Sequence, residues 1–248
     1  MCAGCEPPPE PAAPVYGELL ASAGAAGTSV IDANTDIKSQ LLHCIPTYIE
    51  FRRANPKDYP RLDLAGVERY TRDIEALGFK GVAAYTVKSN AKESSTGYAR
   101  LLVGEELRCL AELNQAFPEE GEPSPVRAVF MSALGDGWGL STTDRKMEWA
   151  NWLLRRPRSM WVSLPDAPMT ALLDRHLSDR RRVSEWLGVR VLEDLSMEAH
   201  CRRELGDSLA RREVIAAKSV FGGMMDALLF KWFPKTEWWG DLKKARRR

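Results

Sequence analysis

The chain has 248 residues, and its 35 basic and 34 acidic side chains leave a formal net charge of +1. With 44% hydrophobic and 28% charged residues, the composition is that of an ordinary globular protein. It excludes a collagen, a wholly disordered chain and a polybasic nucleic-acid-binding protein, so we expect no duplex nucleic acid as a partner. The five cysteines are an odd number, which argues against a closed disulfide framework and favours a reducing, cytoplasmic compartment.

Residues 1–40 are expected to form a flexible leader without a secretory signal. Prolines between Pro7 and Pro14 remove backbone donors, and alanine, glycine and serine then dominate. Such a composition buries too little apolar surface to offset the entropy of ordering. Cys2 and Cys5 have zinc-knuckle spacing, but no second pair follows. Because structural zinc needs four ligands, we expect no metal site.

A strand and an amphipathic helix are expected next. Residues 45–51 are rich in β-branched and aromatic side chains, which favour a strand. After Asp63, the expected N-cap, apolar residues recur at steps of three and four up to Leu77. Gly78 then occupies the position of a left-handed C-cap residue.

Between residues 80 and 164 the pattern changes to short runs of period two, separated by turns. This is typical of antiparallel strands, because parallel strands need longer connections. The expected strands cover residues 81–88, 98–103, 107–114, 126–134, 139–143 and 159–164. Residues 135–137 (Gly-Asp-Gly) favour a hairpin turn rather than a phosphate loop, since no Gly-Lys-Ser/Thr follows. A short helix over 144–156 is expected, with Thr143 or Asp144 as its N-cap.

The helix that ends in Leu77-Gly78-Phe79 and leads into a strand is similar to one module of the vicinal-oxygen-chelate fold. That resemblance implies metal ligands that are histidine or glutamate on facing strands. The segment at His43 is the one expected strand region that carries a histidine. We therefore transfer no site residue from that family and expect no cofactor.

The second half of the chain is expected to be mainly helical. An amphipathic helix is predicted over 167–187, with Asp166 as its cap and Gly188 at its end. The elements together predict a two-layer α+β domain over residues 41–195, with a mainly antiparallel sheet covered by two amphipathic helices. Residues 196–248 are expected to form a helical C-terminal extension with a basic tail.

Four residues are candidates for ligand binding. His176 lies beside the apolar stripe of its helix, which is typical of a satisfied core histidine but also allows a general base facing a pocket. Arg155 and Arg156 lie near tryptophans, and guanidinium groups beside indole rings can hold phosphates or bases. A solvated face with core tryptophans explains the same pattern. Arg145 follows a polar cluster that could line a pocket, whereas His200 lies in a charged helix and is expected to be solvated.

The C-terminal segment, residues 216–248, has the most unusual pattern. Its apolar residues follow one helical face and are Val220, Phe221, Met224, Met225, Leu228, Leu229 and Trp232. This face could pack on the sheet, join two copies of the chain, or lie on an anionic membrane surface with the basic tail on the lipid. Lys218, Asp226 and Lys231 argue against a helix that spans the membrane.

The sequence contains no recognisable nucleophile, metal or nucleotide motif. We therefore expect a ligand- or partner-binding or regulatory domain without catalysis. One alternative is a small-molecule enzyme with a cleft between sheet and helices. Another is a peripheral membrane protein that binds through its C-terminal helix.

Overall fold

The computed structural model describes residues 38–91 and 96–242. Most of the expected leader, with Cys2 and Cys5, lies outside these ranges. The strands are β1 (Ile49–Arg53), β2 (Lys80–Ser89), β3 (Thr96–Gly104), β4 (Cys109–Phe117), β5 (Arg127–Leu134), β6 (Trp138–Thr143), β7 (Ser159–Ser163) and β8 (Glu237–Trp238). The helices are α3 (Leu64–Glu75), α4 (Trp149–Leu153), α5 (Met169–Leu187), α6 (Met197–Ala217) and α7 (Val220–Trp232).

The eight strands form one sheet whose spatial order is the order along the chain, β1 to β8. Neighbouring strands are antiparallel except for β6 and β7, which pair in parallel with Gly139 opposite Ser159. The parallel pair is possible because residues 144–158, which include α4, separate these two strands and give the chain room to cross over. The fold is thus α+β with a mainly antiparallel sheet, as expected.

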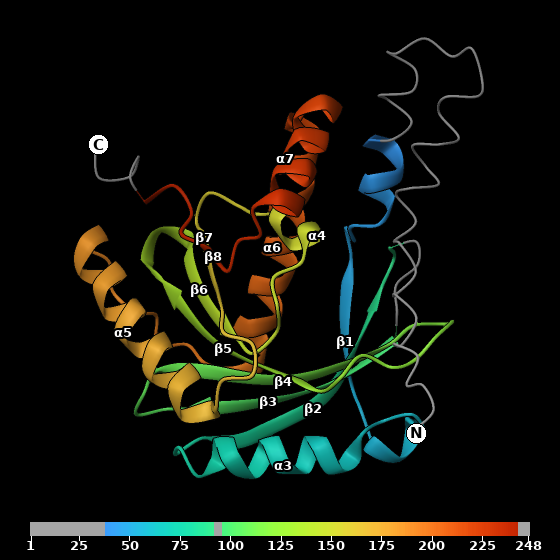
Figure 1. Cartoon of the computed structure of the whole chain (residues 1–248). Coiled ribbons are helices and arrows are strands. Elements are labelled where there is room, and N and C mark those ends of the chain that lie inside the picture. The colour runs from blue at the N-terminus through green and yellow to red at the C-terminus, as the bar shows by residue number, and fades with distance from the viewer. Residues whose placement is uncertain (1–37, 92–95, 243–248) are drawn as a thin grey trace, which may run out of the picture.

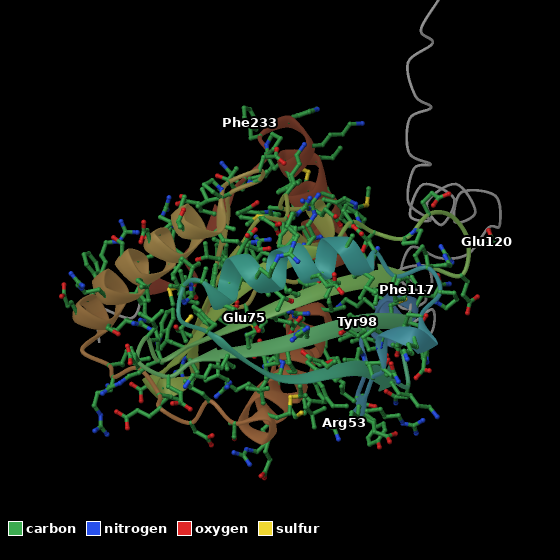
Figure 2. The ribbon with its side chains drawn as sticks, turned by 90° about the horizontal axis from the view of Figure 1, so that it is seen from below. Arg53, Glu75, Tyr98, Phe117, Glu120 and Phe233 are labelled. Carbon is green, nitrogen blue, oxygen red and sulfur yellow. The ribbon has the colours of Figure 1, made fainter. Side chains whose placement is uncertain are left out.

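Helices cover both faces of this sheet. Apolar residues of α3 and α5, such as Ile74 and Leu172, pack against Phe130 in one cluster and so share a face. Met197 of α6 belongs to a different cluster, with Leu101 and Leu110 on the opposite face. Figure 1 shows the sheet bending around α6, with α3 and α5 outside the bend. Figure 2 shows α3 lying across the strands that carry Tyr98 and Phe117.

The local signals for α3 act as the sequence predicts. The Asp63 side chain accepts a hydrogen bond of 2.8 Å from the backbone nitrogen of Gly66, which satisfies one free donor of the first turn. Gly78, just beyond the helix, has a φ angle of 91°, a conformation that glycine adopts without strain. Val67 and Ile74 are buried under the helix.

Two other predicted caps are wrong. The residue at the N-cap of α5 is Pro168, which makes no side-chain capping bond, and Asp166 instead has a left-handed φ of 62° in the preceding turn. α4 begins at Trp149, so it is capped by neither Thr143 nor Asp144. The Asp144 carboxylate is buried and accepts hydrogen bonds from the backbone nitrogen of Ala128 and the hydroxyl of Tyr70, which fixes the end of β6 against α3.

The C-terminal segment belongs to the same sheet. The chain leaves α5, runs through α6 and α7, and returns as β8, which pairs with β7 through Trp161 and Trp238. α7 contacts α4 but leaves most of its large apolar side chains exposed. Of the three arrangements that the sequence leaves open for that face, packing on the sheet is therefore wrong. None of the helices in the described part of the chain has the length and hydropathy needed to cross a membrane.

Candidate ligand-binding cavity beneath α6

A cavity of about 340 Å³ lies between α6 and the face of the sheet that α6 covers. We call it the α6 cavity. Its sheet wall is mostly apolar and comes from three adjacent strands, β4 to β6. The apolar residues that line it include Leu110, Met131, Ala133, Leu192 and Leu195. A volume of this order is typical of sites that hold a small organic molecule.

The opposite wall of the α6 cavity is charged. His200, Arg203, Glu204 and Asp207 line it, and their spacing of three and four residues places them on one side of α6. We call these four residues the α6 polar face. Arg156, from the loop before β7, lines the cavity as well. A helix normally turns an apolar stripe towards a sheet. The charged residues that α6 directs towards the sheet are therefore candidates for a function other than core packing.

His200 is held by two residues of the sheet. The Tyr85 hydroxyl donates a 2.5 Å hydrogen bond to Glu112 Oε2, and its oxygen lies 3.0 Å from Nε2 of His200. Because the hydroxyl proton is directed to Glu112, the Tyr85 oxygen is free to accept a hydrogen from Nε2. Burial opposes ionisation of Glu112, but hydrogen bonds from His200, Tyr85 and Asn114 together lower its pKa.

Arg156, one of the two arginines that line the cavity, already forms an ion pair. Nη2 of Arg156 lies 2.6 Å from Oδ2 of Asp207. Burial lowers the pKa of Arg156, and the Asp207 carboxylate counteracts part of this effect. This pair therefore neutralises itself and fixes α6 against the loop before β7.

Glu204 is different from its neighbours. Within the described residues its carboxylate has no hydrogen bond and no ion pair, although it lines the cavity. Burial raises the pKa of Glu204, and the Glu112 and Asp207 carboxylates raise it further, whereas His200 and Arg211 lower it by a smaller amount. A carboxylate in such a position is costly to ionise unless something in the cavity supplies a donor or a positive charge.

The structure brings two of the four ligand-binding candidates together: Arg155 and Arg156 line a small pocket of about 40 Å³ with Trp152 and Trp161, and the Arg155 guanidinium lies 4.2 Å from the centre of the Trp152 ring. Arg156 lines the α6 cavity, and Arg145 is exposed on the loop after β6, where it pairs with Glu148 at 2.9 Å. Arg155 turns away from the cavity to pair with Asp226 of α7 at 3.1 Å.

His176 lies on the other face of the sheet, under α5, and is fully buried. Its Nε2 is 2.9 Å from the Ser132 hydroxyl and its Nδ1 is 3.1 Å from the Thr142 hydroxyl. Burial lowers its pKa to about 3, with a smaller contribution from Arg180. The ring is thus neutral and satisfied at both nitrogens.

Sequence reasoning missed the α6 polar face. It expects His200 to be solvated, but only 2% of that residue is exposed. A signal is present in the sequence: polar residues recur at positions 200, 203, 204 and 207. In a helix that also carries many other charged residues, this spacing is typical of an ordinary solvent-exposed face. Glu112, on the facing strand, alternates with the apolar residues Ala111 and Leu113, and such alternation favours an outward, solvated side chain.

No cluster of three or more metal-ligating side chains occurs within residues 38–91 and 96–242. Comparisons with models of known protein families, with curated proteins and with solved structures find no match. The chemistry of the α6 cavity is therefore argued from its own residues.

Proposed function

We propose that this protein is a binding domain that takes a small amphipathic amine into the α6 cavity without converting it. The observation that carries the proposal is the carboxylate of Glu204, which lines an apolar-walled cavity and makes no hydrogen bond or ion pair with the described residues, although His200 and Arg211 are close enough to act on its charge. An ammonium group supplies both a positive charge and up to three hydrogen-bond donors.

The other acids around the cavity already have partners, and the cation Arg203 donates a hydrogen bond to the carbonyl of Asp194. Asp207 is neutralised by Arg156, and Glu112 accepts bonds from Tyr85 and His200. Glu204 is therefore the acid left to recognise a ligand. The apolar wall of Leu110 and Met131 would cover the ligand's hydrophobic body, as in most small-molecule sites.

A series of indoles that differ only in their head group tests the proposal. Tryptamine carries an ammonium, tryptophol a hydroxyl and indole-3-acetate a carboxylate. We expect calorimetry at neutral pH to show that tryptamine binds more tightly than tryptophol by about tenfold or more, because a hydrogen bond to a charged group contributes about 1.5–3 kcal/mol. Indole-3-acetate should bind most weakly.

The variant Glu204→Gln should remove the preference for tryptamine. Glu198→Gln, an exposed carboxylate on the same helix, is the matched control and should keep it. Because burial raises the pKa of Glu204 above its ordinary value of 4.5, its ionised form weakens the fold at higher pH, and Glu204→Gln should be at least as stable at neutral pH. Equal tryptamine affinity in both variants, or failure of every indole to bind, would contradict the proposal.

The enzyme alternative has one observation in its favour, which is that His200 reaches the cavity. Its Nε2, however, is engaged by Tyr85 and Glu112, which fits a positioning function better than proton transfer to a ligand. Mass spectrometry of each indole after incubation separates the two functions. Recovery of the unchanged compound supports a binding function, whereas detection of a reaction product would show that the protein is an enzyme.

A further inference from the structure

α7 exposes a continuous apolar face. Phe221 and Trp232, at its two ends, are 73% and 69% exposed. Between them the exposed large residues are Met224, Met225, Leu228 and Leu229. These positions follow the spacing of one helical face, so the face that would normally enter a core is directed to solvent.

The opposite side of α7 is firmly attached to the protein. Asp226 pairs with Arg155 at 3.1 Å and with Lys218 at 2.7 Å. Phe230 is buried, with its ring 6.0 Å from that of Trp152 in α4. The helix is thus held by its smaller, partly polar side, and rolling its larger apolar side inward would break these ion pairs.

The charges around the exposed face are positive. Between residues 214 and 236, Asp226 is the single acidic residue in the sequence, and its charge is taken up by Arg155 and Lys218. Lys231 and Lys235 are exposed at the end of α7. The last six residues of the chain, 243–248, include five basic ones.

We propose that the exposed face of α7 lies on an anionic lipid surface, with Phe221, Leu228 and Trp232 in the interface and Lys231 and Lys235 at the headgroups. Apolar side chains enter the headgroup boundary, and each nearby lysine adds attraction to anionic lipid. A second copy of the chain is a poorer occupant. Two such faces in contact would bring like charges together without a compensating acid.

Co-sedimentation of the full chain with vesicles tests this surface. We expect binding to phosphatidylcholine vesicles that contain phosphatidylserine, weaker binding without phosphatidylserine, and weakening as salt increases. The variant Phe221→Ser/Trp232→Ser should bind at least tenfold less. Tyr48→Ser/Val82→Ser, which changes exposed apolar residues elsewhere, should bind like the unmodified chain.

Replacing Lys231 and Lys235 by glutamine should weaken binding by about fivefold for each residue. Circular dichroism checks that each variant is folded. The proposal is overturned if the full chain does not pellet with anionic vesicles, or if Phe221→Ser/Trp232→Ser binds unchanged. It is also overturned if the full chain does not bind vesicles but forms a dimer, and Phe221→Ser/Trp232→Ser is a monomer. The outcome is independent of indole binding in the α6 cavity.

Discussion

The two buried histidines show how position decides the chemistry of one residue type. His176 and His200 are packed on opposite faces of the same sheet, and both are almost inaccessible to solvent. His176 meets the neutral hydroxyls of Ser132 and Thr142, so nothing near it stabilises a positive charge. His200 lies 3.3 Å from a carboxylate oxygen of Glu112 and lines the α6 cavity.

His176 should make the fold sensitive to acid. Its pKa is 6.5 in the ordinary case and about 3 in the folded protein, so between these pH values the unfolded chain binds the proton and the folded chain does not. Above pH 6.5 His176 does not reduce the free energy of unfolding, and as the pH falls below 6.5 this free energy decreases. The slope approaches about 1.4 kcal/mol per pH unit. Urea unfolding at a series of pH values measures it.

In the variant His176→Gln, the free energy of unfolding should fall less steeply with decreasing pH, even if its value at neutral pH is lower. His43→Gln, which changes an exposed histidine, should keep the slope of the unmodified chain. Identical slopes in both variants would show that another group controls the acid response.

At the residue scale, prediction succeeds where one side chain decides the outcome. The position of His176 beside the apolar stripe of its helix indicates burial, and the residue is fully buried. His200 could not be placed because its environment depends on Tyr85 and Glu112, which are far away in the sequence.

At the element scale, the helices differ in how much of their packing the sequence determines. α3 carries an apolar stripe and its own cap, so its bounds and its buried face follow from local chemistry. α6 and α7 do not follow the usual rule that the apolar face of a helix is buried. α6 turns charged residues towards the sheet, and α7 turns apolar residues towards solvent. Periodicity shows that such faces exist, but it does not say what each face contacts.

Removal of the α3 cap should have a measurable cost. Gly66 has no side chain, and a Cβ there would lie 2.3 Å from Oδ2 of Asp63, so these two residues form one capping unit. Asp63→Ala should lower the free energy of unfolding by about 1 kcal/mol. Urea denaturation checks this value. Asp73→Ala, an exposed position in the same helix, is the control, and an equal loss there would argue against a capping effect.

At the scale of the whole molecule, the C-terminal extension completes the sheet rather than following it. β8 pairs with β7, and the Ser208 hydroxyl of α6 donates to the carbonyl of Pro46, before β1. The sequence indicates a boundary near residue 195 because the composition changes there. Composition does not show that a late strand returns to an early sheet, which depends on pairing between distant segments.

Because α6 and β8 contact both ends of the sheet, we expect the whole protein to unfold in one cooperative step. Tryptophan fluorescence reports on Trp138 and Trp161 in the sheet and also on Trp232 in α7 and Trp238 in β8, whereas circular dichroism reports mainly on the helices. The two signals should follow the same urea transition, as they do when no intermediate is populated. An early transition in circular dichroism that is accompanied by only part of the fluorescence change would mean that residues 196–248 unfold as an independent unit. In that case the α6 cavity would open before the sheet is lost, and ligand binding should delay that first step alone.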